Sequence, residues 1–371
     1  MTPLHAIARG FRAALPTAGP QAPLLALAPM QDVTDLPFWR LMARHGGPDV
    51  YYTEYFRVHA TSNLERPILR SLAENPTGRP AIAQMIGNDI PSLVRTAREL
   101  QHYPVAAIDL NLGCPAPIVF KKCAGGGLLR EPARVDAILG ELRNAIRIPF
   151  TVKTRVGFDS ADGFDHILAL FEKHKPDLVT VHARTVQQMY RSPVHYDLIK
   201  RAVETLSMPV LANGDVDSAD KALWTLAETG AAGLMMGRGA IRNPWIFDQI
   251  RAALRGEPIR IPTGREVLRY IHELYHEVKP PVIRESAQVQ KMKRYMNYLG
   301  LGVDPEGRFL HDVRRVATEQ EFFAVCARFL DHDTPMDLKP FPVVRDPGGL
   351  GGSQTRGTHE LPESEDCLDA C

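Results

Sequence analysis

The chain has 371 residues, enough for one large and one smaller domain, and 44% of them are hydrophobic, so it can bury a full core. Its 44 Lys and Arg residues are balanced by 43 Asp and Glu residues, which neither indicates nor excludes a polyanionic partner. No apolar run approaches the ~18 residues of a membrane span, and the five cysteines show no metal-ligand spacing. We therefore expect a cytoplasmic protein with reduced thiols, no membrane segment and no metal site.

Eight short apolar runs follow an N-terminal segment, residues 1–22, that we predict to be an irregular leader. The runs are Leu24–Ala28, Val50–Glu54, Ala81–Ile86, Ala106–Leu110, Phe150–Thr154, Leu178–His182, Val210–Asn213 and Gly233–Met236. Segments with helical spacing lie between most of them, so residues 23–255 are predicted to form an α/β fold, the (β/α)₈ TIM barrel. A doubly wound sheet is disfavoured, because Pro29 and Met30 stand where that fold carries a glycine fingerprint.

The composition changes after the last predicted barrel helix. Residues 256–264, GEPIRIPTG, are a linker by composition. Residues 265–332 regain helical periodicity and predict a small all-helical domain. Beyond them Pro, Gly, Ser and acidic residues dominate, so residues 333–371 are predicted to be a disordered tail.

Polar residues stand at the C-terminal ends of nearly all the predicted strands, where the active sites of such barrels lie. They are Gln84, Asn111, Lys153, Arg155, His182, Arg184, Asn213, Asp215 and Arg238, with Pro29, Met30, Cys114, Gly214 and Gly237 beside them. A polar residue at a strand end is costly to the core, and so many of them are best explained by convergence on one site. The pattern therefore predicts an active site at this end of the barrel.

Cys114 follows the fourth strand and stands between Gly113 and Pro115. A lone cysteine is more often a small buried hydrophobe than a catalyst, but a cysteine fixed on such a loop is poorly placed for core packing. We therefore predict a chemical role for Cys114. Pro115 and Pro117 predict a loop that is not helical. Three glycines at 125–127 indicate either close approach of a cofactor or nucleic-acid backbone, or a flexible turn.

The last two strand ends carry the residue types of a phosphate site. Gly214 and Gly237 allow backbone N–H groups to approach phosphate oxygens, and Arg238 adds a forked donor; two ordinary turns are the alternative. Lys153 is placed either to form a Schiff base or to set a positive charge beside a cofactor. His182 is either a satisfied core residue or a contact to cofactor or substrate.

The run DLNLGCPAPIVFKKCAGGGLL, residues 109–129, resembles the signature of the tRNA-dihydrouridine synthases. That signature reads N-x-G-C-P, then a valine, then a glycine-rich segment that ends in Leu-Leu; Cys123 departs from the usual pattern. The motifs LAPM, QMIG, VKTRVG, VHART, ANGD and MGRG occur in the family's order. The resemblance covers about residues 24–330.

The resemblance implies an enzyme that reduces uridine in tRNA to 5,6-dihydrouridine, with FMN as cofactor and NADPH as reductant. It implies a hydride from reduced FMN to uracil C6 and a proton from Cys114 to C5, since a thiol with an ordinary pKa near ~8.5 is protonated at neutral pH. It assigns Asn111, Arg155 and Arg184 to the substrate. The flavin site it implies contains Pro29, Met30, Gln84, Lys153, His182, Asn213, Gly214, Asp215, Gly237 and Arg238.

A local basic excess lies in the predicted helical domain, where residues 279–315 contain eight Lys and Arg against four Asp and Glu. On a helical wheel, Arg284, Lys291 and Arg294 oppose an apolar face formed by Val289, Met292, Met296 and Leu299. A basic face is usually only solvated. Taken together with the family resemblance, however, this basic face predicts contact with the tRNA backbone. Lys121 and Lys122 on the Cys114 loop are expected to make further contacts with it.

Two rival functions stay open. A Schiff-base aldolase that uses Lys153 is compatible with the same barrel, and a non-catalytic RNA-binding protein on a flavin barrel is compatible with the basic helix. The presence of Cys114 argues against the non-catalytic RNA-binding protein. A flavin spectrum would distinguish an FMN-dependent enzyme from the aldolase. The motifs together favour a monomeric, FMN-dependent tRNA-dihydrouridine synthase.

Overall fold

The computed structural model describes residues 3–15 and 22–341, which form two compact units. The first unit runs to Ile259, except that residues 241–243 group with the second unit, which continues from Arg260. No helix in the described part of the chain is long and apolar enough to cross a membrane.

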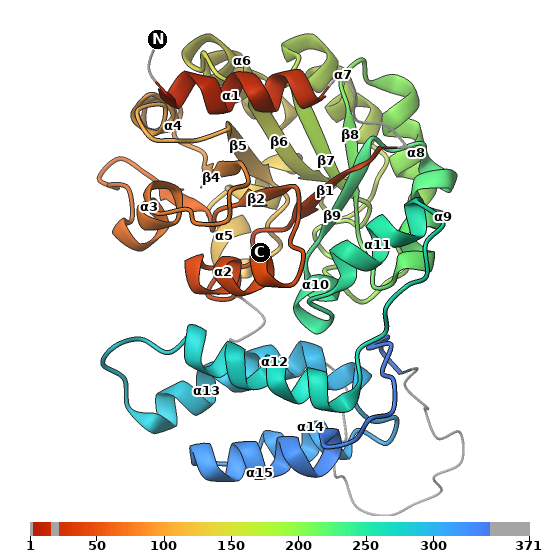
Figure 1. The fold of residues 1–371 in the computed structure, drawn as a ribbon. Coiled ribbons are helices and arrows are strands. Elements are labelled where there is room, and N and C mark those ends of the chain that lie inside the picture. The colour runs from red at the N-terminus through yellow and green to blue at the C-terminus, as the bar shows by residue number, and fades with distance from the viewer. Residues whose placement is uncertain (1–2, 16–21, 342–371) are drawn as a thin grey trace, which may run out of the picture. The chain divides into compact units, whose positions relative to one another are not determined.

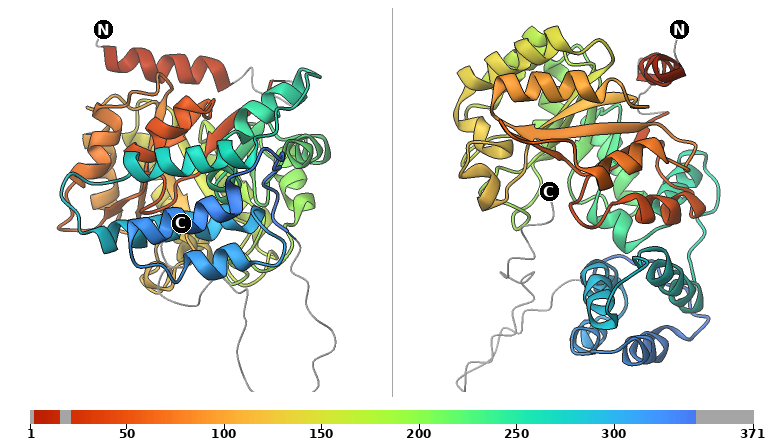
Figure 2. Two further views of the ribbon diagram at one scale, coloured as in Figure 1. Left: turned by 60° about the horizontal axis from the view of Figure 1, so that its bottom comes forward. Right: turned by 90° about the vertical axis from the view of Figure 1, so that its left-hand side faces the viewer.

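The first unit is a closed parallel barrel with helices around it (Figures 1 and 2). Its strands are β1 (Leu24–Leu27), β2 (Val50–Tyr52), β4 (Ala81–Gly87), β5 (Ala107–Leu112), β6 (Phe150–Arg155), β7 (Leu178–His182), β8 (Val210–Asn213) and β9 (Gly233–Met236). Pairing of β9 with β1 closes the ring. The TIM barrel and its eight predicted strands are confirmed. A short extra strand, β3 (Phe56–Val58), pairs with β4.

The barrel helices follow the strands as the spacing predicts. They are α2 (Leu36–Arg44), α3 (Arg66–Ala73), α4 (Ile90–Leu100), α6 (Pro132–Ala145), α7 (Phe164–His174), α8 (Tyr196–Thr205), α9 (Ala219–Thr229), α10 (Arg238–Arg242) and α11 (Ile246–Leu254). Asp35 caps α2 by accepting from the N–H of Phe38, and Ser218 caps α9 by accepting from that of Lys221. These caps fix where each helix begins after its strand-end loop.

The N-terminal segment was predicted to be irregular, and this prediction is wrong. The segment contains a helix, α1 (Pro3–Ala14), that lies across one end of the barrel (Figure 1). Phe11 and Leu15 are buried in the core cluster that includes Ala26 and Ile82. Arg12 pairs with Asp177, the residue before β7, at 3.3 Å. The sequence did not indicate this helix because prolines and arginines are interspersed in the segment, whereas Ala8, Phe11 and Leu15 are spaced so that they share one buried face. The helix covers the end opposite the predicted active site.

The second unit is all-helical, as predicted, with α12 (Gly264–Glu277), α13 (Glu285–Leu299), α14 (Arg308–Val313) and α15 (Glu319–Leu330). Capping boxes start α12 at Thr263 and α15 at Thr318. The predicted apolar face of α13 is buried and forms part of the core. Helix α12 begins at the last residue of the predicted linker.

The first part of the predicted disordered tail is ordered. In residues 333–341, the N–H of Met336 donates to the carbonyl of Pro262, and that of Phe341 donates to the carbonyl of Leu301. Leu338 is only 1% exposed. These backbone bonds and one buried leucine hold a segment that has no helical or strand periodicity, which is why the pattern missed it. The rest of the predicted tail, residues 342–371, lies outside the described residues.

Candidate active site

Cys114 lies just beyond the C-terminal end of β5 and is only 1% exposed. Strand β5 extends to Leu112, two residues further than predicted, so Asn111 is part of the strand. The prolines do not keep the loop free of helix: Pro117 begins a one-turn helix, α5 (Pro117–Phe120). A proline fits the first position of a helix because its missing N–H would have no partner there.

The glycines at 125–127 pack against the Cys114 loop itself. They begin a 3₁₀ helix, η2 (Gly125–Arg130), and all three are buried. A Cβ on Gly125 would lie 2.9 Å from Cys114 Cβ, and one on Gly126 would lie 2.9 Å from the Cys114 carbonyl oxygen. The N–H of Gly126 donates to that same oxygen at 3.1 Å. The close approach that these glycines allow is thus between η2 and the Cys114 turn, not the approach of a cofactor or nucleic-acid backbone that the sequence suggested, and the segment is a 3₁₀ helix instead of a flexible turn.

A continuous chain of buried hydrogen bonds leads from the barrel interior to the backbone of Cys114. Gln84 Nε2 donates to Asp109 Oδ2 at 2.8 Å. Asn111 Nδ2 donates to Gln84 Oε1 at 2.9 Å. Asn111 Oδ1 then accepts from the N–H groups of Gly113 and Cys114, both at 2.9 Å. Asn111 therefore fixes the turn that carries the thiol.

Asp109 is the buried end of this chain and was missed as a site residue. Its other oxygen, Oδ1, accepts from Thr151 Oγ1 at 2.6 Å. Burial raises the pKa of Asp109 to about 6, while the hydrogen bonds from Thr151 and Gln84 and the charge of Lys153 act in the opposite direction. The signal that could have found it is a carboxylate inside an otherwise apolar strand, which is rare without a purpose.

Basic side chains gather at the ends of β6 to β9. They are Lys153 and Arg155 from β6, His182 and Arg184 at the end of β7, and Arg238 after β9. Burial holds the pKa of His182 well below its usual range, and the charges of Arg155, Lys153, Arg184 and Arg238 lower it further. His182 is therefore neutral at physiological pH.

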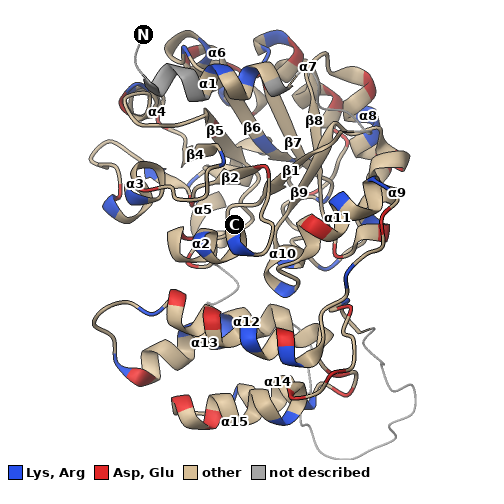
Figure 3. Ribbon diagram, in the orientation of Figure 1, with Lys and Arg blue, Asp and Glu red and all other residues tan. Residues whose placement is uncertain are grey.

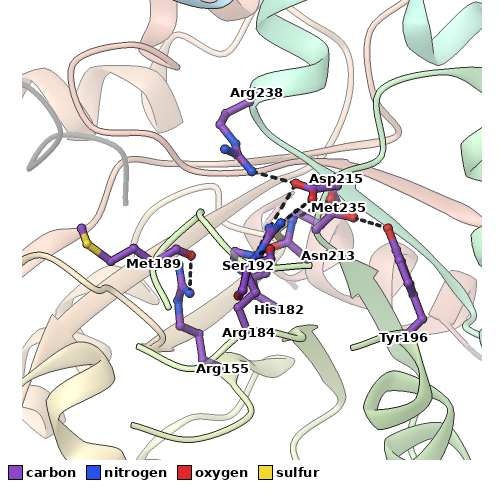
Figure 4. Close-up of polar contacts among 11 residues, drawn as sticks. Arg155, His182, Arg184, Met189, Ser192, Tyr196, Asn213, Asp215, Met235 and Arg238 are labelled. Carbon is purple, nitrogen blue, oxygen red and sulfur yellow. Dashed lines mark hydrogen bonds and ion pairs between the residues drawn. The ribbon is translucent and has the colours of Figure 1, made fainter. Parts of the chain in front are cut away.

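Arg155 connects the loops around the site. Its Nε donates to the Gly113 carbonyl at 2.9 Å, and its Nη1 donates to the carbonyls of Thr185 and Met189, both at 2.8 Å. These bonds tie the loop after β5 to the loop after β7; Figure 4 shows the bond to Met189. Arg155 was predicted to bind substrate, and in the structure its Nε and Nη1 donate to backbone carbonyls.

Asp215 brings two arginines together, as Figure 4 shows. Arg184 forms a forked ion pair with it, and Arg238 Nη2 lies 2.8 Å from Asp215 Oδ1. The Arg184 side chain is 3% exposed, whereas that of Asp215 is 41% exposed. Gly214, with φ of +130°, and Asp215, with φ of +47°, make the sharp turn after β8. Asn213 Nδ2 donates to the Met235 carbonyl at 2.8 Å and holds that turn against β9.

Tyr190 is a second residue that the sequence did not indicate. Its ring lies 5.3 Å from Arg155 Cζ and 4.7 Å from Arg238 Cζ. It also stacks on His182, with ring centroids 6.2 Å apart. No pattern in the sequence marks it, because these contacts depend on how the loop after β7 folds back.

The remaining barrel predictions lie near these groups. Pro29 and Met30 are buried after β1, and a Cβ on Gly237 would lie 3.0 Å from Met30 Sδ, so the ends of β1 and β9 meet. Lys121 and Lys122 are exposed on the Cys114 loop. Among the predicted barrel residues, Gln84, Asn111 and Lys153 lie within β4, β5 and β6, and the others lie at strand ends or in the loops that follow them.

The three basic residues predicted to contact RNA belong to the second unit. Arg284 is exposed, whereas Lys291 and Arg294 are half-buried, and Lys291 Nζ donates to the Val278 carbonyl at 3.1 Å. Acidic as well as basic residues lie along α12, α13 and α15 (Figure 3).

The comparisons with known proteins agree with this geometry. The model of the family described as dihydrouridine synthase (Dus) matches residues 26–332. The chain belongs to the dihydrouridine synthase family. It is accordingly an enzyme, an oxidoreductase of the Dus family.

Similar proteins come from several bacteria. The chain is 34% identical to tRNA-dihydrouridine synthase B of Vibrio parahaemolyticus, over 74% of this chain and 90% of the relative. It is 30% identical to a tRNA-dihydrouridine(16) synthase of Neisseria meningitidis, over 80% and 92%. It is 34% identical to a tRNA-dihydrouridine(16) synthase of Pseudomonas putida, over 74% and 87%. These alignments span nearly the full length of the relatives.

Proposed function

We propose that this Dus-family enzyme reduces uridine in tRNA to 5,6-dihydrouridine, with FMN as cofactor and NADPH as reductant. The observation that carries the proposal is the turn of Cys114, held by Asn111 at the end of β5. That turn stands in the same barrel end as the basic groups that follow β6 to β9. We further propose that the protein acts as a cytoplasmic monomer.

The residues at the barrel end fit FMN. Arg238 provides a forked donor for a phosphate, and Asp215, which pairs with both Arg238 and Arg184, positions the two guanidinium groups at this end of the barrel. The tight turn at Gly214 lets backbone N–H groups approach that phosphate. Gln84, Met30, Lys153 and His182 would line the ring, to which neutral His182 adds no charge. When bound, FMN supplies the hydride chemistry that no side chain provides.

Cys114 is the proposed proton donor to C5 of the uracil. A general acid must hold its proton before the reaction, and an ordinary thiol does so at neutral pH. The Asn111 contacts and the packing of Gly125 fix the thiol's Cβ, so the proton is delivered from a set position. Asn111 and Arg184 are proposed to hold the base, while Arg155 holds together the loops that surround it.

The contact with RNA is proposed to extend beyond the barrel. Lys121 and Lys122 on the exposed side of the Cys114 loop would pair with phosphates next to the reacting nucleotide. Arg284, Lys291 and Arg294 of the helical unit would add contacts to the tRNA backbone. Such contacts raise affinity without reading sequence.

The cofactor proposal is tested by removing one of the phosphate donors. Arg238→Ala should lower the amount of FMN retained during purification, because a forked donor is lost. The measurement is the FMN released by denaturation, per protein. Arg255→Ala is the matched control, since Arg255 is an exposed arginine of the same unit that pairs with Glu257. Equal FMN occupancy in both variants would place the phosphate elsewhere, and a colourless wild-type protein would favour the Lys153 aldolase.

A further inference from the structure

We propose that Asp109 is a positioning residue for the reaction: as a buried acceptor it orients Gln84 and Asn111, and through them the turn that holds Cys114. The catalytic part of this proposal rests on the function proposed above. Its structural part, control of the Cys114 turn, stands on the hydrogen bonds alone.

The groups at the two ends of this hydrogen-bond network determine which atoms donate and which accept along it. An ionised carboxylate only accepts hydrogen bonds, so Gln84 must present its amide nitrogen to Asp109. Gln84 then presents its oxygen to Asn111, whose nitrogen donates to it. Asn111 is left with its oxygen toward the N–H groups of Gly113 and Cys114, which only donate. Both ends thus demand the same orientation of the two amides.

The strand register places these groups in line. Gln84 pairs with Asp109 across β4 and β5, and Asp109 pairs with Thr151 across β5 and β6. Register partners on neighbouring strands point to the same face, which here is the barrel interior. Gln84 and Asp109 are fully buried. A buried network of this kind is costly when one partner is missing, so its members keep a single arrangement.

The chain determines what the two amides offer to a ligand. The side-chain amide nitrogens of Gln84 and Asn111 each carry two hydrogens, and each donates one of them within the hydrogen-bond network. The second hydrogen of each is then a donor suited to the ring carbonyls of a flavin or a uracil. Asp109 therefore sets the donor character of the site without offering a donor of its own, because its fully buried carboxylate accepts from Gln84 and Thr151.

Replacement of Asp109 separates its role as an acceptor from its charge and its bulk. Asp109→Leu removes the acceptor and leaves Gln84 Nε2 without its partner. Asp109→Asn keeps an amide oxygen for Gln84, and its nitrogen can donate to Thr151, so the chain can persist. Thr151→Val is the matched control, because it removes a bond to Asp109 that does not lead to Cys114. Should Asp109→Leu not fold, Asp109→Val removes the same acceptor with a side chain suited to a strand.

The first measurement does not depend on activity. We expect the alkylation of Cys114 by iodoacetamide, followed by peptide mass spectrometry, to be about tenfold faster in Asp109→Leu, because a loosened turn exposes a thiol that is now 1% exposed. Alkylation of Cys326, which is buried in the helical unit, reports unfolding of that unit, and far-UV circular dichroism reports unfolding of the barrel in the same sample. Asp109→Asn and Thr151→Val should react at the wild-type rate.

The second measurement is the reduction of tRNA. We expect kcat of Asp109→Leu to fall by about 10²-fold with KM for tRNA unchanged, as for a displaced catalytic group. Asp109→Asn should recover to within a few-fold of wild type. Wild-type alkylation and kcat in Asp109→Leu would overturn the inference, as would an Asp109→Asn variant as impaired as Asp109→Leu. A wild-type enzyme that makes no dihydrouridine would instead refute the proposed function and leave the alkylation result standing.

Discussion

At the scale of single residues, two neighbours fix the backbone of Cys114: one lies on β5, before the turn, and one lies on the 3₁₀ helix η2, after it. Asn111 holds its N–H, and Gly126 donates to its carbonyl. The backbone on both sides of the thiol is therefore fixed. A group fixed in this way suits proton transfer, which requires a short and well-aligned approach.

Cys114→Ala tests this assignment. The variant should keep FMN and oxidise NADPH, while formation of dihydrouridine falls by roughly 10²–10⁴-fold, the effect of losing a general acid. Cys123→Ala is the control and should have a mild effect, because Cys123 lies on the same loop with its thiol bonded to Glu131. A Cys114→Ala variant that reduces tRNA at nearly the normal rate would show that the proton comes from another group.

Asp109 also predicts how stability depends on pH. Its pKa rises from 3.8 to about 6 on folding, mainly through burial, although Lys153 on β6 opposes the rise. Tyr52 on β2 is a second titratable group that faces it. The folded protein then binds more protons than the unfolded chain between these values, so Asp109 lowers stability as pH rises from about 4 to 6.

The comparison with Asp109→Asn isolates this effect, since asparagine does not titrate. The free energy of unfolding of the wild type, minus that of Asp109→Asn, should fall by roughly 2 kcal/mol between pH 4 and 6. Urea unfolding at several pH values measures it. A difference that stays constant over this range would mean that Asp109 has an ordinary pKa.

At the scale of secondary-structure elements, the glycines that begin η2 determine how closely it approaches the Cys114 turn. A Cβ on Gly126 would lie 2.4 Å from Val186 Cγ2, on the loop after β7. Gly126→Ala should therefore destabilise the protein by about 1–3 kcal/mol, as overpacking does, and should also slow tRNA reduction. Gly163→Ala is the matched control, because no atom lies within 4 Å of its added Cβ. Equal thermal stability of the two variants would show that η2 shifts without cost.

The barrel strands could be predicted from the sequence because a buried parallel strand is a short apolar run, and eight such runs repeat. The predicted strand ends also identified the side of the barrel on which the candidate site residues lie. Helix α1 was missed because its apolar residues, Phe11 among them, occur within a segment rich in prolines and arginines. The ordered segment at residues 333–341 was missed because its order comes from backbone hydrogen bonds to residues distant in the sequence.

The arrangement of side chains within the site could be predicted only in part. The sequence indicated Gln84, Asn111 and Cys114 separately, but not that hydrogen bonds join them. Asp109 became visible as part of the site only when the register brought it beside Gln84. Tyr190 depends on the path of a loop, which no local pattern encodes.

At the scale of the whole molecule, the near-zero net charge conceals a local basic excess in residues 279–315, which contain eight Lys and Arg against four Asp and Glu. If Arg284, Lys291 and Arg294 track the tRNA backbone, changing all three to Ala should weaken tRNA binding. Each lost phosphate contact should reduce the log–log salt slope by about 0.7–0.9. Titration of tRNA at several salt concentrations measures it. The contribution of Lys291 should be the smallest, because its Nζ already donates to the Val278 carbonyl.

The matched control is Arg265→Ala, which removes a cation of the same unit that pairs with Asp331 and Asp333. It should leave the salt slope unchanged. FMN content should be the same in all variants, because the barrel is untouched. An unchanged tRNA affinity in the triple variant would mean that this face of α13 is only solvated.

The most direct test of the account is the mass of tRNA after reaction with the purified enzyme. Unmodified tRNA is incubated with the protein and NADPH, digested to nucleosides and analysed by mass spectrometry. We expect one or more uridines to gain two hydrogens in the wild-type reaction, and most of this gain to be lost with Cys114→Ala. A wild-type protein that binds FMN and oxidises NADPH, yet leaves every uridine unreduced, would contradict this expectation.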